Sequence, residues 1–358
     1  MEKIWKGADV SLLEELEQHG ASYQLEGVPG DLFEILSRCG VDLIRLRLWN
    51  DPYSEDGQSY GGGGNDLAAT IRLAKRLRHY GLAFLLDFHY SDFWADPAKQ
   101  VKPKAWRELH GQQLEEAVYR YTKDTLLLLK QEGVLPQMVQ VGNEITKGLL
   151  WPDGHSDDPE GMLALLAAGI RGVRETDPGI RILLHLDFGT DNALYRSWFS
   201  RAEDYGLDYD VIGMSYYPFW NGSLQALAEN MNDISRRFQK DVMVVETSIG
   251  YTTDPLGSKA MVYSRELEQK TPYPGTMQGQ EAYLRALFQT VRQVQSRRGI
   301  GVIYWEPAWL PFPDCAWAKP VGCAYMHDDA QLGNSWANQA LFDPRGNANP
   351  ALVNLKSM

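Results

Sequence analysis

The feature that most constrains the fold of this chain is a regular alternation of short apolar runs with amphipathic helical patterns. The apolar runs are continuous and rich in β-branched residues, which is typical of parallel strands covered on both faces. Eight such runs in order favour closure into a barrel over an open sheet. We therefore predict an α/β protein with a (β/α)8 TIM-barrel fold, which suits 358 residues. The predicted strands cover residues 6–11, 41–49, 82–89, 138–144, 180–187, 209–215, 241–246 and 299–305.

Helical patterns fill the segments between these strands. Two of them stop at Gly40 and Gly81, a natural position for glycine just past a helix end. No linker, repeat or low-complexity tract divides the chain, so we predict one catalytic domain over residues 1–358. The irregular segment after the last strand, about 306–358, is expected to cap or wall the active face. The predicted helices cover residues 31–38, 67–80, 112–131, 160–176, 193–205, 224–238 and 280–295.

Composition narrows the class of partner. The formal net charge of −12 argues against nucleic acid and anionic membrane surfaces, because both reward patches of lysine and arginine. No run of about 18 apolar residues is present, so no membrane span is predicted. A neutral substrate is compatible with this charge. Eleven tryptophans and eighteen tyrosines exceed what a core needs, and part of them are expected to stack on sugars.

The cysteines and the N-terminus bear on the compartment. Three cysteines do not form a disulfide scaffold, and Cys39 is expected to be a small buried residue. Cys315 and Cys323 fall in one proline-rich loop, and whether they pair is left open. As written, the chain starts without a signal peptide, which predicts a cytoplasmic protein; it would be extracellular if a signal peptide has been removed.

Two glutamates carry most of the functional information. Glu144 and Glu246 each close an apolar run, and they lie 102 residues apart, about three strand-helix repeats. They should therefore sit at the mouths of the fourth and seventh strands, facing one another. A protonated acid and an ionised nucleophile in that arrangement are what a retaining glycosidase needs, with carboxyl groups about 5–5.5 Å apart.

Other polar and aromatic residues at strand ends support this interpretation. Arg45 and Arg47 are two residues apart and share one side of the sheet, so an arginine inside the barrel could hold Glu246 ionised. Asn143 could bind a sugar hydroxyl beside the cleaved bond. Supporting roles are also predicted for His89, for Tyr216 or Tyr217 as a hydrogen-bond donor to the nucleophile, and for Trp305 as a subsite floor.

Two other motifs are set aside. Gly61 to Gly64 lacks the spacing of a phosphate-binding loop and is predicted to be a flexible surface loop. The seven histidines show no metal-ligand spacing, so no transition metal is predicted.

Taken together, the strand-end blocks resemble those of glycoside hydrolase family 53. The blocks are residues 41–50, 89–97, 141–145, 185–187, 215–220, 245–248 and 304–309, and they occur in order from Gly7 to about Asp343. The resemblance implies an endo-acting, retaining arabinogalactan endo-β-1,4-galactanase with Glu144 as acid/base and Glu246 as nucleophile. The chain departs from the family pattern in a longer, glycine-rich loop at residues 51–64.

The resemblance also implies how substrate is bound. It implies substrate contacts by Trp94, Trp220 and the tryptophan of the last strand. Because Trp94, Trp220, Trp305 and Trp309 come from different loops, we also expect them to line an extended groove. Asp92, Asp187 or the loop after the second strand could bind the axial 4-hydroxyl of galactose. The expected partner is β-1,4-galactan or its oligosaccharides. No cofactor is required for the chemistry; a structural calcium is possible, as in some bacterial relatives, but no clear ligand motif supports it. The alternatives are an endo-glycanase acting on mannan, glucan or xylan, and a non-catalytic galactan-binding barrel.

Overall fold

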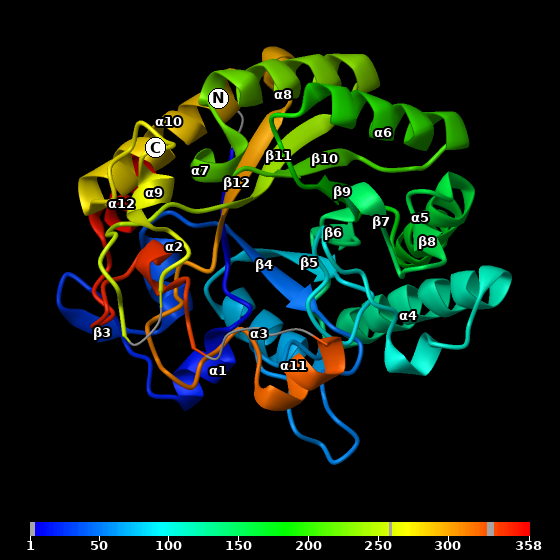
Figure 1. Ribbon diagram of the computed structural model, residues 1–358, viewed down its shortest axis with the longest axis horizontal. Coiled ribbons are helices and arrows are strands. Elements are labelled where there is room, and N and C mark those ends of the chain that lie inside the picture. Colours follow the sequence, from blue (N-terminus) through cyan, green and yellow to red (C-terminus); the bar gives the residue numbers. More distant parts are fainter. Residues whose placement is uncertain (1–3, 258–259, 328–332) are drawn as a thin grey trace.

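The computed structural model describes residues 4–257, 260–327 and 333–358. Eight parallel strands form a closed barrel in the order β1-β12-β11-β10-β9-β6-β5-β4, surrounded by helices (Figure 1). This confirms the predicted fold, and every predicted strand is present within a few residues. The barrel strands are β1 (Trp5–Asp9), β4 (Leu43–Leu48), β5 (Ala83–Phe88), β6 (Met138–Val141), β9 (Arg181–Leu186), β10 (Val211–Ser215), β11 (Asp241–Thr247) and β12 (Gly299–Trp305).

All the helices that cover the barrel except the long helix at residues 111–131 begin at side-chain caps. Asp66, for example, accepts a hydrogen bond from Ala69 N at 2.7 Å and starts α3, as its sequence position predicts. In the part of the chain that the structure describes, no helix combines the length and apolarity needed to cross a membrane. The outer helices are α2 (Leu32–Arg38), α3 (Leu67–His79), α4 (Gly111–Gln131), α5 (Pro159–Thr176), α6 (Asn192–Tyr205), α8 (Leu224–Phe238) and α10 (Met277–Arg292).

Short elements in the loops were not predicted, because two to seven residues give no measurable periodicity. They are the hairpins β2 (Tyr23–Leu25) with β3 (Val28–Gly30) and β7 (Gly148–Leu149) with β8 (Gly154–His155), the helices α1 (Leu13–Gln18), α7 (Pro218–Asn221), α9 (Arg265–Glu268), α11 (Pro320–Met326) and α12 (Pro350–Val353), and the 3₁₀ turns η1 (Lys104–Trp106), η2 (Ile145–Lys147), η3 (Gln295–Arg297), η4 (Ala337–Gln339) and η5 (Leu355–Ser357).

The barrel interior has an apolar layer below a polar one. Because side chains alternate along a strand, the residue two positions after an apolar interior residue also points inward. Leu43 is thus followed by Arg45, and Leu85 by Asp87, and all four are buried. The apolar layer consists of Leu43, Leu85, Met138, Leu183, Val211, Met243, Val245 and Ile303. A separate and larger apolar core lies between the strands and the helices.

A β-bulge in β11 sets the direction of Glu246. Met214 pairs with Val244, but Ser215 pairs with Glu246, so Val245 is skipped in the register. Val245 belongs to the apolar interior layer, and strict alternation would turn the next side chain outward. The bulge instead brings Glu246 inward beside it, and bulges commonly re-aim side chains next to active sites in this way.

The segment after β12 does two different things. Its first part, including α11, lines the cavity at the mouth of the barrel, as predicted. Its last part runs back along the outside: α12 packs on α10, and Leu355 O accepts a hydrogen bond from Lys6 Nζ at 2.7 Å. The prediction that the whole segment walls the active face is therefore only partly right. Residues 328–332 of this segment lie outside the described residues.

The prediction of a flexible loop at Gly61 to Gly64 is wrong. All four glycines have positive φ, and a Cβ on Gly62 would lie 2.9 Å from Trp317 O and 3.0 Å from the Trp49 and Trp94 rings. The loop is glycine-rich because the backbone passes close to other residues in a left-handed conformation. Cys315, whose pairing with Cys323 was left open, is a free thiol, so these two cysteines do not form a disulfide; Cys39 is a buried free thiol, as expected.

Candidate active site

A cavity of about 590 Å³ opens at the carboxyl ends of the barrel strands. In a (β/α)8 barrel this is the end where active sites lie. Both glutamates singled out in the sequence line it, from the expected fourth and seventh barrel strands. Further lining residues come from β4, from the end of β12 and from the loops after β5, β6, β10, β11 and β12, and include Arg47, His89, Trp94, Asp96, Lys99, Asn143, Tyr217, Trp220, Trp305, Trp317 and Trp336.

Glu144 lies just after β6 on a constrained backbone. Its φ is 48°, the left-handed region that few side chains other than glycine adopt. Glu144 Oε1 lies 2.7 Å from Ser215 Oγ, which in turn lies 2.9 Å from His185 Nε2. Burial, and then the negative charges of Glu246 and Asp187, raise the pKa of Glu144 well above its ordinary value.

Glu246 has opposite surroundings. Arg45 Nη1 lies 2.8 Å from Glu246 Oε1, and the Tyr217 hydroxyl donates to Glu246 Oε2 at 3.2 Å. Burial raises the pKa of Glu246, while the Arg45 guanidinium opposes that rise. Glu246 contacts a cation and a phenol, whereas Glu144 contacts neither. Glu246 is therefore the group that ionises first, and Glu144 is the group that keeps its proton.

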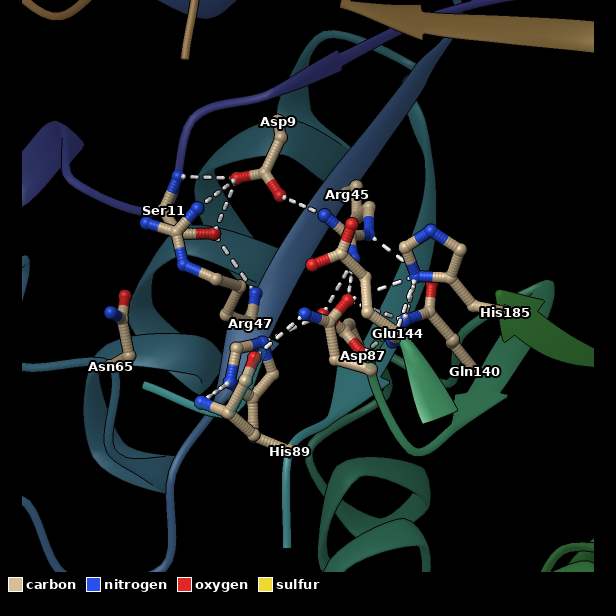
Figure 2. A network of polar contacts seen from close by, with 12 residues as sticks. Asp9, Ser11, Arg45, Arg47, Asn65, Asp87, His89, Gln140, Glu144 and His185 are labelled. Atoms are coloured by element: carbon tan, nitrogen blue, oxygen red, sulfur yellow. Dashed lines mark hydrogen bonds and ion pairs between the residues drawn. The ribbon is translucent and has the colours of Figure 1, made fainter. Parts of the chain in front are cut away.

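Arg45 is the centre of a buried polar network (Figure 2). Its guanidinium lies 2.8 Å from Asp9 Oδ2 and 2.8 Å from Asp87 Oδ2, and it donates to Asn143 Oδ1 at 2.8 Å. Arg47 lies 3.0 Å from Asp9 Oδ1. The predicted pairing of an arginine with Glu246 is thus observed for Arg45, while Arg47 points to other carboxylates.

Asn143 and His89 are both held from within the barrel. Asn143 Nδ2 donates to Ala95 O at 2.9 Å, so its amide orientation is fixed by Arg45 on one side and a backbone carbonyl on the other. His89 lies 3.0 Å from Asp87 through Nε2. Burial, followed by the charge of Arg45, lowers the pKa of His185 well below its ordinary value, so that imidazole is neutral.

Aromatic rings form one wall of the cavity. Trp94, Trp220 and Trp305 line it, as predicted, and Trp220 is 51% exposed. Trp317 and Trp336 complete this wall but were not predicted, because they follow no strand and lie in the irregular segment. Trp305 stacks on Trp317 with ring centroids 5.5 Å apart. Such an extended aromatic surface suits sugar rings.

Five predicted site residues do not line the cavity, namely Arg45, Asp92, Asp187, Tyr216 and Trp309. Trp309 is completely buried, and its Nε1 donates to Cys315 O at 3.1 Å, so it supports the wall from behind. Tyr216 points away from Glu246, because neighbouring residues of an extended chain face opposite sides, and its hydroxyl donates to Gly222 O at 2.7 Å. Asp92 accepts hydrogen bonds from Asp51 N and Lys104 N and holds loops together.

Asp187 takes an intermediate position. It is buried, accepts a hydrogen bond from Thr146 Oγ1, and does not line the cavity, although its charge contributes to the raised pKa of Glu144. Asp96 and Lys99, which do line the cavity, were missed, because an Asp and a Lys in a polar loop carry no distinguishing pattern. Among residues 4–257, 260–327 and 333–358, no three or more His, Cys, Asp or Glu side chains are grouped as metal ligands.

Comparison with known proteins gives consistent results. The family model described as glycosyl hydrolase family 53 matches residues 5–355. The chain is 43% identical over 349 residues to the "Uncharacterized protein in bgaB 5′region" of Niallia circulans, covering 95% of this chain and 90% of that protein. It is 39% identical over 366 residues to the endo-beta-1,4-galactanase of Bacillus subtilis (strain 168), covering 97% and 84%. The solved Ignisphaera aggregans GH53 catalytic domain superposes with a TM-score of 0.93 at 38% identity, covering 99% of this chain and 95% of that one.

Proposed function

Because the chain belongs to glycosyl hydrolase family 53, we propose that it is an endo-acting β-1,4-galactanase that cleaves galactan with retention of anomeric configuration. The observation that carries this proposal is the pair of buried glutamates in one cavity with opposite surroundings. Glu246 contacts a guanidinium and a phenol, whereas Glu144 contacts Ser215 and faces other negative charges.

The proposed reaction is a double displacement. Ionised Glu246 attacks the anomeric carbon while Glu144 donates its proton to the departing glycosidic oxygen. Glu144, now a carboxylate, then takes a proton from water, which attacks the same carbon from the side the leaving group vacated and releases Glu246. This mechanism requires the two carboxyl groups to lie about 5–5.5 Å apart, which we expect in crystals of the enzyme.

The surroundings of each glutamate suit its step. The Arg45 guanidinium stabilises the charged form of Glu246 that attacks, and the Tyr217 hydroxyl can stay bonded as that charge is lost and regained. Burial and nearby carboxylates disfavour the charge of Glu144 and raise its pKa, which suits the group that must start the reaction protonated. Since the two carboxyls supply nucleophile, acid and base, we expect no cofactor in the chemistry.

The substrate assignment draws on the relatives and on the shape of the site. The relatives described as galactanases from Bacillus subtilis and Cellvibrio japonicus align over 97% and 99% of this chain. The cavity wall is aromatic, which favours the apolar faces of sugar rings, and the net charge of −12 favours a neutral polymer. Tryptophans from separate loops form a continuous wall, which suits internal bonds of a chain.

The test is product analysis on a panel of polysaccharides. Linear β-1,4-galactan should be cleaved first to oligosaccharides of several lengths, with galactose appearing late, while mannan, xylan and carboxymethylcellulose remain intact. Product configuration should be followed by proton NMR in the first minutes and should be β.

Each other outcome rejects a definite part of the proposal. Cleavage of mannan or xylan instead of galactan rejects the substrate. Galactose as the sole early product rejects the endo mode, and an α product rejects retention. Tight binding to galactan without cleavage would make the protein a binding barrel.

A further inference from the structure

Glu306, directly after β12, is a buried carboxyl that the proposed reaction does not use. It is completely buried, and its φ of 47° is in the left-handed region, where a glycine would be less strained. Glu306 Oε1 lies 2.6 Å from Arg47 Nη2, while Oε2 has no hydrogen-bond partner in the described part of the chain. A strained backbone that carries a half-satisfied acid suggests that the side chain is retained for function.

The network around Glu306 contains more acids than bases. Its two cations, Arg45 and Arg47, face Asp9, Asp87, Glu246 and Glu306. His89 adds no charge, because Trp49 Nε1–H and Ala95 N–H both donate to its Nδ1, at 3.1 and 3.2 Å, and leave only Nε2 protonated. If every carboxyl were ionised, the network would hold two uncompensated negative charges in a buried site, which is costly.

The contacts indicate which carboxyl is neutral. Asp9 accepts hydrogen bonds on both oxygens, from Arg47 and Ser11 on Oδ1 and from Arg45 on Oδ2. Asp87 likewise has Gln140 on Oδ1 and Arg45 on Oδ2. Burial would raise the pKa of Asp87, but the charge of Arg45 and the hydrogen bond from His89 Nε2 hold it below the ordinary value. Glu306 contacts Arg47 through one oxygen, and its other oxygen has no hydrogen-bond partner in the described residues. Protonation therefore costs less free energy at Glu306 than at Asp9 or Asp87.

We propose that Glu306 is a positioning residue that stays protonated in the working enzyme. The neutral Glu306 carboxyl holds Arg47 by a hydrogen bond, so the network keeps a single uncompensated negative charge, and that charge lies on the nucleophile Glu246. Arg47 packs its guanidinium 4.7 Å from the Trp94 ring and 5.5 Å from the Trp305 ring, so Glu306 also fixes the floor of the aromatic wall. When Glu246 forms its covalent bond to the sugar, the network becomes neutral.

The groups that face Glu306 are consistent with this assignment. Burial raises the pKa of Glu306 to about 8, Arg47 opposes the rise, and Asp9 adds to it. Tyr23, whose hydroxyl donates to Ala308 O, stays neutral because burial raises its pKa well above the usual range.

The first test needs no variant. Neutron diffraction from a crystal of the wild-type protein, exchanged into D₂O near neutral pD, should reveal a deuteron on the Glu306 carboxyl and none on Asp9 or Asp87. A deuteron on Asp9 or Asp87, or none on the three, overturns the proposal.

The second test uses the pH dependence of stability. A carboxyl whose folded pKa is raised stabilises the fold below its unfolded pKa, near 4.5, and that contribution is lost as the pH rises toward about 8. Glu306→Gln keeps the hydrogen-bonding shape but cannot titrate. As the pH rises from about 4.5 to about 8, the unfolding free energy of the wild type should therefore fall relative to that of the variant. Glu108→Gln, an exposed change in the loop before α4, is the control and should run parallel to wild type.

Parallel curves for Glu306→Gln and the wild type overturn the proposal, and if the variant does not fold, the neutron result decides alone. The inference rests on the proposed role of Glu246 as nucleophile. Neither measurement uses galactan cleavage, so a failure here is distinguishable from a failure of the proposed function.

Discussion

Glu144 and Glu246 share a cavity but are held by different kinds of structure. Glu246 is part of strand β11, turned inward by a bulge and fixed by Arg45, whose other acidic partners, Asp9 and Asp87, are completely buried. Glu144 lies beyond the end of β6 in a strained turn and contacts a serine hydroxyl. One carboxyl therefore sits on the rigid sheet beside a cation, and the other on a loop among negative charges.

The comparison shows how backbone position and nearby charges suit two identical side chains to different roles, nucleophile and acid/base. A nucleophile has to meet the anomeric carbon with little freedom, and a bulged strand locks it there. An acid/base has to lose and regain a proton, and burial near other carboxylates raises the pKa of such a group so that it can begin protonated. The predictions below test this contrast, from the largest expected effect to the smallest.

Removal of the nucleophile should have the largest effect. Glu246→Ala is expected to lower kcat on galactan by roughly 10⁴-fold or more, because a group that bonds to the substrate is lost. Azide, which fits the space left by the carboxylate, should restore part of the turnover and give a glycosyl azide of inverted configuration. Rate measurements with and without azide, with the products examined by NMR, check this.

If azide rescue of Glu246→Ala gave a product of retained configuration, the two roles would be reversed. The variant should fold normally as judged by circular dichroism, since the alanine removes one negative charge from a network with a surplus of them.

Removal of the acid/base should have a smaller effect that depends on the substrate. Glu144→Ala is expected to lower activity on galactan by about 10²- to 10⁴-fold, the usual contribution of a general acid. An aryl galactoside with a good leaving group needs no proton, so its first step should be nearly unaffected. A burst of phenol release followed by slow turnover checks this, and an equal loss on both substrates would contradict the contrast.

The sequence predicted the barrel well because each strand is a continuous apolar run, buried on both faces. It placed both glutamates at strand ends for the same reason. The bulge could not be predicted: strict alternation from the interior residue Val245 turns Glu246 outward, and only the pairing with β10 shows otherwise. Tyr217 could be separated from Tyr216 only in the folded chain.

The loops were the least predictable part. Gly61 to Gly64 reads as a flexible segment, but three of its glycines have backbone or ring atoms within 3.1 Å of an added Cβ. Trp309 and Trp336 belong to the same irregular segment and look equivalent in sequence, yet one is buried behind the wall and the other lines it. Such distinctions depend on contacts between distant segments, which local patterns do not encode.

The Tyr217 hydroxyl should matter moderately and in a pH-dependent way. Tyr217→Phe removes a donor to Glu246, and a hydrogen bond to a charged group contributes about 1.5–3 kcal/mol, or about 10- to 150-fold in rate. Loss of the donor disfavours the ionised carboxylate, so the pKa of Glu246 rises and the acid limb of kcat/KM moves to higher pH. The alkaline limb, which follows Glu144, should not move.

The matched control is Tyr216→Phe, because the Tyr216 hydroxyl contacts Gly222 O on the other side of the chain. Its pH profile should match that of the wild type. A shift of the acid limb in the control, or of the alkaline limb in Tyr217→Phe, would mean that the phenol does not act on Glu246.

The smallest effect is expected at the edge of the aromatic wall, where Trp94 and Trp220 differ as sharply as the two glutamates. Trp94 donates to Trp317 O at 2.7 Å and contacts Trp49, so its removal should cost stability as well as binding. Trp220 is half exposed, and Trp220→Ala should weaken galactan binding by about 1 kcal/mol, roughly fivefold, while the melting temperature stays unchanged. Affinity electrophoresis in galactan gels, with Tyr205→Ala on the outer surface of α6 as the control, measures this. Equal losses in the two variants would show that Trp220 does not contact the polymer, and the groove would then end at Trp336.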